Sequence, residues 1–464
     1  MTSYLPVIES VPSKSSSFLN VYKDQNNTRE SAVRVLNSTC FKQNFQSKAF
    51  GETTTVLLPK NKLLSNVYLT CNLAGTPVEK SYLPEGWMYR LIEYVEYSYG
   101  SNNILRLTPQ AMWALTVSQA ESGEKVKRLL ELAGRERTSN DAWSDAEPPL
   151  VGCINIPLPH SSVNAGDVIP FDASIVTDPI SITVAFKRAD QVFSFADANA
   201  ADVRTALAAV SMKEVYLSCR TSYMVDGPSD SVAPLVGFGG PNSYSYMFKY
   251  PGYYRSDTFT VTEGGDKRMD PVILNLLGVL PGSMQSIDLF LERITFDADF
   301  NTTMNKSKYN PLLTYALSDV ELLYAGQCIF KGEDTTHALM SICDYTSFPG
   351  VSMNSPPYSA TDQTAAAESV PRVSSWTHIQ LSQFHTSISN LVQAGCSLNT
   401  NNLQVSFRAP KLSELGLGST TPDLPTTPPQ WRLHVVYTYQ ASLYTADGST
   451  NILFQRPATI LPSV

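Results

Sequence analysis

The sequence predicts a mostly β protein built from two domains of similar plan. Most of the chain consists of short segments in which apolar and polar residues alternate, separated by clusters of Gly, Pro, Asn and Ser, which is typical of β-strands. With 464 residues, 43% of them hydrophobic and 10% aromatic, the chain has enough apolar material for more than one packed core. Segments of the first half also match segments of the second half in the same order.

Composition argues against several classes of function. The net charge of −8 disfavours a general electrostatic grip on nucleic acid phosphates, which requires a basic surface. The seven cysteines are scattered, so we interpret them as small buried hydrophobic residues in a reducing compartment rather than as disulfides or zinc ligands. No basic start followed by an apolar run opens the chain, and no segment reaches the roughly 18 to 20 apolar residues that span a bilayer. We therefore expect synthesis in the cytosol without a signal peptide.

The clearest strands are Val67–Leu73 and Ile182–Phe186, in which every second residue is apolar and would line one face of a sheet. Helical patterns are few, and they cover Pro109–Gln119, Glu124–Arg135 and Ala196–Val210. We expect these helices to lie between strands and to cover the edges or ends of the sheets.

The two halves repeat the same elements at a nearly constant spacing. Four pairs of strands match, and Ile104 matches Ile329. In the first half the strand that ends at Tyr99 precedes the helical pattern Pro109–Gln119. In the second half the strand that ends at Tyr324 precedes the helical pattern Thr335–Ile342. The strand pairs are Val67–Leu69 with Leu289–Leu291, Val95–Tyr99 with Val320–Tyr324, Ile182–Lys187 with Leu403–Arg408, and Val215–Tyr223 with Leu433–Tyr444.

This repeat predicts three parts of the chain. Residues 1–35 are polar and lack periodicity, as a flexible arm does. Residues 36–226 and 227–464 form the two β domains, joined near Asp226–Ser229. Each domain offers about eight strands with long, irregular connections, which favours a two-sheet jelly roll over a simple meander or a smaller immunoglobulin-like sandwich. The predicted fold is therefore two consecutive eight-stranded antiparallel jelly rolls with short helices in the connections.

Five segments of the first half follow one another in a distinctive order. They are a strand at Leu63–Leu73, a strand at Ile92–Tyr97, a helix at Pro109–Val117 that contains Trp113, a proline-punctuated strand at Ile156–Pro159, and a strand at Ile180–Val184. In this order they resemble the double jelly-roll major capsid proteins of icosahedral double-stranded DNA viruses, of the nucleocytoplasmic large DNA virus, virophage and Polinton-like type. The chain departs from that pattern at His160-Ser161-Ser162, where the family usually carries aromatic residues.

The resemblance implies a structural protein of the virion and not an enzyme. In such viruses three copies form a pseudo-hexagonal homotrimeric capsomer, and the capsomers tile an icosahedral shell. The implied partners are other copies of the chain, neighbouring capsomers, and penton and minor capsid proteins, without direct binding of nucleic acid. The arm 1–35 is either a clamp on neighbouring proteins or on an internal lipid membrane, or a disordered tail. The connections Gly75–Arg90, Gly227–Asn242 and Tyr345–Ser375 are expected at exposed or inter-capsomer surfaces.

No catalytic, cofactor-binding or metal-binding residue is predicted. Glu93 and Glu96 lie three residues apart in a strand and would point to opposite faces, which does not suit acid/base catalysis. The glycine-containing stretch 235–241 lacks the Gly-Lys-Ser/Thr ending of a phosphate loop. The five histidines lack the spacing of metal ligands, and they are His160, His337, His378, His385 and His434.

The tyrosine-rich run Tyr244–Arg255 leaves alternatives open. We interpret it as core or interface, because Tyr is favoured both in strands and at protein interfaces. As a stacking platform it would instead suit a two-domain β-sandwich carbohydrate-binding protein. A glycoside hydrolase is a third alternative, and it would require two facing carboxylates roughly 5 to 10 Å apart.

Overall fold

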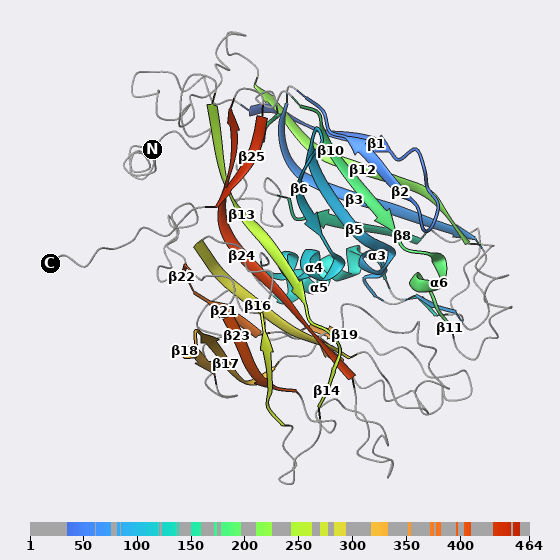
Figure 1. Cartoon of the computed structure of the whole chain (residues 1–464). Coiled ribbons are helices and arrows are strands. Elements are labelled where there is room, and N and C mark those ends of the chain that lie inside the picture. The colour runs from blue at the N-terminus through green and yellow to red at the C-terminus, as the bar shows by residue number, and fades with distance from the viewer. Residues whose placement is uncertain are drawn as a thin grey trace.

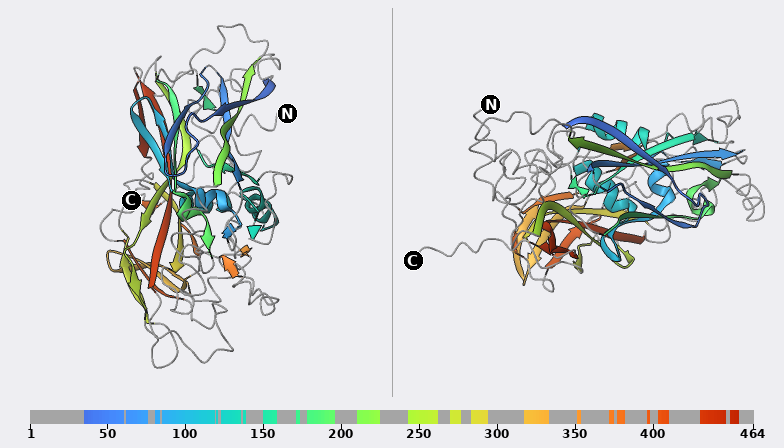
Figure 2. Two further views of the ribbon diagram at one scale, coloured as in Figure 1. Left: turned by 90° about the vertical axis from the view of Figure 1, so that its right-hand side faces the viewer. Right: turned by 90° about the horizontal axis from the view of Figure 1, so that it is seen from above.

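The chain folds into two pairs of antiparallel sheets, each pair forming one sandwich (Figure 1). The structure is a computed structural model, and two views turned by 90° show the blue-to-green sandwich beside the yellow-to-red one (Figure 2). The residues that the structure describes are 35–60, 62–75, 81–83, 85–118, 120, 123–135, 137–138, 150–158, 171–173, 178–195, 210–224, 243–261, 270–276, 283–293, 317–332, 351–353, 372–374, 377–381, 396–397, 403–409, 430–446 and 449–454.

The first sandwich is a jelly roll of eight main strands. One sheet has the order β1-β12-β3-β8 and the other the order β2-β10-β5-β6, so the first and last strands pair with each other. These strands are β1 (Val35–Asn44), β2 (Thr53–Leu57), β3 (Leu63–Gly75), β5 (Ile92–Tyr99), β6 (Asn102–Leu107), β8 (Leu150–Ile156), β10 (Ile180–Phe186) and β12 (Val210–Met224).

The second sandwich repeats this topology strand for strand. Its sheets have the orders β13-β24-β16-β21 and β15-β23-β17-β18, and β13 again pairs with the last main strand, β24. Its strands are β13 (Ser243–Arg255), β15 (Val272–Asn275), β16 (Ser283–Arg293), β17 (Ser318–Tyr324), β18 (Gln327–Gly332), β21 (Thr377–Gln380), β23 (Leu403–Arg408) and β24 (Gln430–Ala446). Two consecutive eight-stranded jelly rolls, the predicted fold, are therefore confirmed.

Short elements complete the architecture. The small strands are β4 (Ser81–Leu83), β7 (Arg137–Thr138), β9 (Phe171–Asp172), β11 (Ser194–Phe195), β14 (Phe259–Thr260), β19 (Val351–Met353), β20 (Arg372–Ser374), β22 (Cys396–Ser397) and β25 (Ser449–Phe454). The helices in the described part of the chain are α3 (Trp87–Leu91), α4 (Pro109–Ser118), α5 (Gly123–Leu132) and α6 (Ala189–Val192). No helix in the described part of the chain combines the length and apolar character needed to cross a bilayer.

All four strand pairs of the sequence repeat occupy equivalent places in the two jelly rolls. They fall on β3 and β16, β5 and β17, β10 and β23, and β12 and β24. Ile104 and Ile329 are also equivalent, because each is the extra residue of a β-bulge on the strand that follows the matched Val-Glu segment. The predicted repeat of strands is thus confirmed, and the bulge on the strand after the Val-Glu segment falls at the same position in both jelly rolls.

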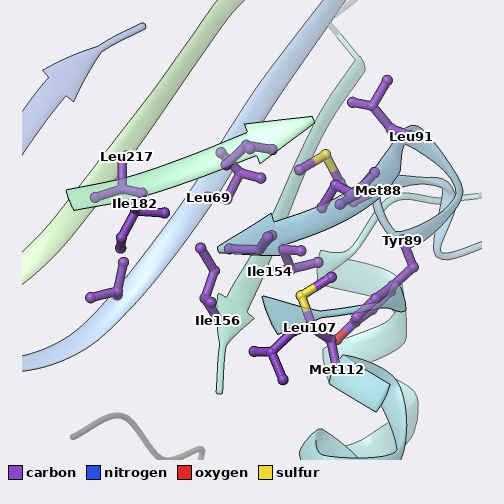
Figure 3. Close-up of a cluster of buried hydrophobic side chains, with 14 of the residues drawn as sticks. Leu69, Met88, Tyr89, Leu91, Leu107, Met112, Ile154, Ile156, Ile182 and Leu217 are labelled. Carbon is purple, nitrogen blue, oxygen red and sulfur yellow. The ribbon is translucent and has the colours of Figure 1, made fainter. Parts of the chain in front are cut away.

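The core of the first jelly roll lies between its two sheets and is closed by helices (Figure 3). The predicted apolar row of β3, Val67 to Leu73, is buried at every second residue. Burying each such side chain contributes about 1.5–3 kcal/mol. The side chains labelled in Figure 3 come from both sheets and from α3 and α4, and they are Leu69, Ile154, Ile156 and Leu217 in one sheet, Leu107 and Ile182 in the other, and Met88, Tyr89, Leu91 and Met112 in the helices.

Three local expectations are corrected. The strand expected across Ile156–Pro159 ends at Ile156, because Pro157 has no N–H for the ladder. Val210 begins β12 rather than ending a helix. The connection Gly75–Arg90 is not wholly at a surface, since the part from Trp87 to Arg90 forms buried helix α3.

Other expectations lie outside the described residues: the rest of the helix expected at 196–209, the helix at 335–342, the linker 226–229, the glycine stretch 235–241 and the connections 227–242 and, for most of its length, 345–375.

The helix expected over Glu124–Arg135 ends three residues early, at Leu132. Gly134 then adopts a left-handed backbone with φ +124°, which L side chains rarely adopt. A Cβ on Gly134 would lie 2.1 Å from Nε1 of Trp87, which is fully buried. The turn at Gly134 therefore leaves room for the indole ring of Trp87, the first residue of α3.

We expect Gly134→Ala to lower the free energy of unfolding by about 3 kcal/mol, through backbone strain and overpacking against Trp87. Gly326→Ala is the matched control, because Gly326 has φ +80° but no atom within 4 Å of its Cβ position, and we expect a loss of about 1 kcal/mol. Urea unfolding followed by tryptophan fluorescence measures both. Equal losses would show that the contact with Trp87 is unimportant.

Candidate functional site

The two jelly rolls contact each other through the outer face of a sheet in the second. Helix α4 of the first jelly roll lies against β13 and β24, and β6 lies against β25 (Figure 1). Phe290 and Val436 belong to the buried cluster of the first jelly roll, whereas their neighbours Leu291 and Val435 belong to that of the second. Successive residues of β16 and β24 thus enter different cores, and both strands are buried on two faces. We call this contact the closed joint.

A polar network lies within the closed joint around His434, which is only 1% exposed. The Tyr253 hydroxyl lies 2.7 Å from Nδ1 of His434, and Nε2 lies 2.5 Å from Oε2 of Glu292. An ionised carboxylate only accepts hydrogen bonds, so Nε2 donates to Glu292, and the second hydrogen bond joins Nδ1 to the Tyr253 hydroxyl. The Phe290 ring stacks on the imidazole at 5.2 Å between centroids, and Nη1 of Arg432 lies 3.6 Å from Glu292.

The first jelly roll contributes to this network from its own side. Thr108, just before α4, hydrogen-bonds the side chain of Tyr253, and burial raises the pKa of this tyrosine. Lys187 follows β10, and burial together with the Arg90 charge lowers its pKa, while the carboxylates Glu93 and Glu292 act in the opposite direction. The closed joint therefore places Thr108 beside Tyr253 and brings Lys187 near enough to Glu292 for the carboxylate charge to affect its pKa.

A second set of charges lies on the outward faces, at matching positions in the two jelly rolls. Glu96 on β5 faces Arg106 on β6 at 3.5 Å, and the equivalent Glu321 on β17 faces Lys331 on β18 at 2.8 Å. Glu93, by contrast, is exposed at a bulge of β5. The carboxylate of Glu96 thus has a cation as its partner.

The tyrosine-rich run forms β13, and those of its tyrosines whose side chains are described pack inward. Tyr253 packs against the first core, Tyr254 against the second, and Tyr250 against both, as the core interpretation expects. Among the described residues, no three His, Cys, Asp or Glu side chains gather as metal ligands. His160, His337 and His385 lie outside the described residues, and of His378 only the backbone, in β21, is described.

The expectation that the cysteines are buried is correct for Cys71 and Cys219, where burial raises the thiol pKa, to about 12 for Cys219. It is wrong for Cys40 and Cys328, which are exposed on β1 and β18. Sequence spacing also missed His434. One signal in the sequence could have indicated the site of His434. It is a polar residue, such as Glu292 near Phe290, in a strand that is apolar on both faces.

No family model matches the chain, and no curated protein matches it in sequence. Solved structures do match over nearly the whole chain. The VP54 protein of PBCV-1, fitted into a reconstruction of the virophage Sputnik, has a TM-score of 0.58 and 11% identity, covering 90% of this chain and 97% of that one. A PBCV-1 capsid chain has a TM-score of 0.54 and 12% identity, with the same coverage. A chain of the Sputnik virophage has a TM-score of 0.55 and 10% identity, and the match covers 92% of each of the two chains.

The chain has the fold of double jelly-roll capsid proteins. The similarity extends over both jelly rolls, because the matches cover at least 90% of this chain. The resemblance seen in the sequence covered the first half directly and the second only through the internal repeat, so the structure extends it.

We expect Glu292→Gln to lower the free energy of unfolding by about 2–3 kcal/mol, because the change weakens the buried hydrogen bond to His434 and removes the carboxylate that pairs with half-buried Arg432. The matched control is Glu321→Gln. That residue pairs with Lys331 at the surface, where an ion pair contributes about 0.5 kcal/mol. Urea unfolding measures both changes, and a loss for Glu292→Gln no larger than the control would contradict the role of the network.

Alkaline pH should destabilise the folded chain. Burial raises the pKa of Tyr89 to about 12 and raises that of Tyr253 and Tyr437 as well, whereas unfolded tyrosines titrate near about 10. Their contribution is complete below about pH 10 and is lost as pH rises toward the folded values. Tyr253→Phe should reduce the slope of unfolding free energy against pH above about 10, by up to about 1.4 kcal/mol per pH unit. An unchanged slope in this variant would show that folding does not raise the pKa of Tyr253.

Proposed function

We propose that this chain is the major capsid protein of an icosahedral double-stranded DNA virus, with a structural and not a catalytic role. The observation that carries this proposal is the presence of two jelly rolls of identical topology in one chain, joined along a buried face. The match in fold to chains of the PBCV-1 capsid and of the Sputnik virophage supports it.

In this proposal three copies form a pseudo-hexagonal capsomer. Two similar jelly rolls in each of three chains supply six similar walls, and a six-walled unit tiles a shell. The domain limits belong to the proposal: an arm at residues 1–35, a first jelly roll at 36–226 and a second at 227–464. Many recurring contacts between identical subunits make a closed shell stable even when each contact is weak.

The proposed partners are other copies of the chain, neighbouring capsomers, and penton and minor capsid proteins. The arm 1–35 is proposed as the element that reaches these neighbours or an internal lipid membrane. The protein would reside in the virion. The net charge of −8 supports the absence of direct contacts with the viral genome.

The carbohydrate-binding alternative is less well supported. Its stacking platform was the tyrosine-rich run, and Tyr250, Tyr253 and Tyr254 pack against the two cores instead of forming an open aromatic surface. The glycoside hydrolase alternative required two facing carboxylates, and Glu96 and Glu292 each pair with a cation or a histidine.

The purified chain should behave as a trimer, with three times the 51.0 kDa mass of one chain in size-exclusion chromatography with light scattering. Negative-stain micrographs of this material should show particles with a hexagonal outline, and sheets or shells at higher concentration. A monomer at every concentration would count against the capsid role. A monomer whose melting temperature rises with an added glycan would favour a carbohydrate-binding protein.

A further inference from the structure

We infer that neighbouring capsomers join through strand β2, which pairs antiparallel with β2 of a second copy about a two-fold axis at Thr55. This inference rests on the proposed function, and it names a contact between capsomers that the trimer itself does not supply. It follows from the direction of the backbone groups of β2, from the protection of the opposite sheet edges and from the charges at the two ends of the strand.

Strand β2 lies at the edge of its sheet, and among the described strands it pairs only with β10. The Leu58 amide donates to the Ile180 carbonyl at 2.8 Å, and the Glu52 carbonyl accepts from the Phe186 amide at 2.9 Å. Because backbone groups alternate in direction along an antiparallel strand, the even-numbered residues of 52–58 face β10 and the odd-numbered residues face away. The residues that direct both backbone groups outward are Thr53, Thr55 and Leu57.

The opposite edges of the four-stranded sheets are protected against pairing, and β2 is not. The ladders of β6 and β18 each contain a bulge, and each of these strands carries a cation, Arg106 or Lys331. Bulges and charged side chains are common means by which proteins prevent a further strand from pairing. The ladder of β2 runs without a bulge, and the residues of this strand are uncharged. Its Leu57 side chain is 54% exposed, so an apolar side chain lies in water at an unprotected edge.

The charges at the two ends of β2 favour a second copy of the same strand as its partner. Glu52 precedes the strand, Lys60 follows it, and both are exposed. In an antiparallel pair the acidic end of each copy lies beside the basic end of the other, whereas a parallel pair would bring like charges together. Arg188 lies near the acidic end but leaves this balance unchanged, because it pairs with Asp190 at 2.8 Å.

Thr55 is the centre of the pair because it is the middle one of the three residues whose backbone groups face outward. Thr55 then meets Thr55 of the second copy, Thr53 meets Leu57, and residues opposite in this way exchange N–H···O bonds. The threonine rows of the two outer faces also join, since the hydroxyls of Thr55 and Thr183 already hydrogen-bond at 2.8 Å within one chain. The four-stranded sheets of the two copies would thus form one continuous sheet.

The equivalent edge of the second jelly roll, β15, is less suited to such a pair. The Leu276 amide donates to the Leu403 carbonyl at 2.8 Å, so within β15 only Ile273 and Asn275 direct their backbone groups outward. A pair of β15 strands would therefore form fewer hydrogen bonds than a pair of β2 strands. A contact that uses the same strand on both sides is isologous, so it joins two capsomers without extending into an open filament.

A cysteine placed at the two-fold axis tests this contact. Thr55→Cys would put two thiols opposite each other at a Cα separation of about 5.5 Å, which a disulfide can span. Thr53→Cys is the matched control, because it changes the same residue type on the same exposed edge. Its two thiols would lie more than about 13 Å apart along the paired strands. Both changes are made together with Cys40→Ser and Cys328→Ser, which remove exposed thiols.

Oxidised glutathione is added to the concentrated full-length protein, and the products are separated by non-reducing electrophoresis. We expect Thr55→Cys to give a species with twice the 51.0 kDa mass of one chain, several-fold more abundant than in Thr53→Cys. Equal cross-linking of the two variants would indicate random collisions and would overturn the contact. Absence of cross-linking in both variants would overturn it as well.

The charges at the ends of β2 provide a second test. Glu52→Lys and Lys60→Glu should each reduce the yield of the Thr55→Cys cross-link, because like charges then meet across the pair. The two changes together should restore the yield, since the acidic and basic ends are exchanged in both copies. Glu52 also accepts a hydrogen bond from Ser47, so thermal unfolding checks that each variant remains folded. A double variant with no higher yield than the single variants would contradict the antiparallel pair.

The outcomes separate this contact from the proposed function. A native trimer in which Thr55→Cys and Thr53→Cys behave alike overturns the contact and leaves the capsomer standing. Selective cross-linking of Thr55→Cys in a chain that otherwise remains monomeric at every concentration supports the β2 pair and overturns the capsomer.

Discussion

The architecture depends on one sheet that is buried on both faces. Strands β16 and β24 send alternate side chains into two different cores, so Val435 supports the second jelly roll while Val436 supports the first. A strand of this kind cannot shift by one residue without exchanging every side chain between the two cores. The position of one jelly roll relative to the other is therefore set by the same alternation that forms the sheet.

The polar network within this sheet acts differently from the apolar contacts around it. Apolar surfaces attract without direction, whereas the line from Tyr253 through His434 to Glu292 requires each donor to meet one acceptor. In a buried setting a misaligned partner leaves an unsatisfied group, which costs about 1–3 kcal/mol. The network thus selects one arrangement of the two jelly rolls from those that apolar packing alone would tolerate.

The positions of the strands could be predicted from the sequence, because apolar and polar residues alternate along a strand according to which of its side chains are buried. The row in Val67–Leu73 and the repeat that ends in Ile104 and Ile329 needed no knowledge of distant residues. The candidate site could not be predicted in this way. His434 is separated from Glu292 by 142 residues and from Tyr253 by 181, so only the folded sheet brings them together. The exposed cysteines were missed for a related reason, since an edge strand looks like any other strand in sequence.

The pairing of the first and last strands affects how this chain reaches its folded state. Strand β1 finds its partner only when β12 has been synthesised, up to Met224, and β13 likewise waits for β24. At typical synthesis rates of about 5–20 residues per second, β1 remains without its partner for on the order of ten seconds. During this interval its unpaired edge can pair with nascent chains on neighbouring ribosomes. The chain therefore carries a kinetic hazard in its topology, and slower expression or chaperone supply should raise its soluble yield.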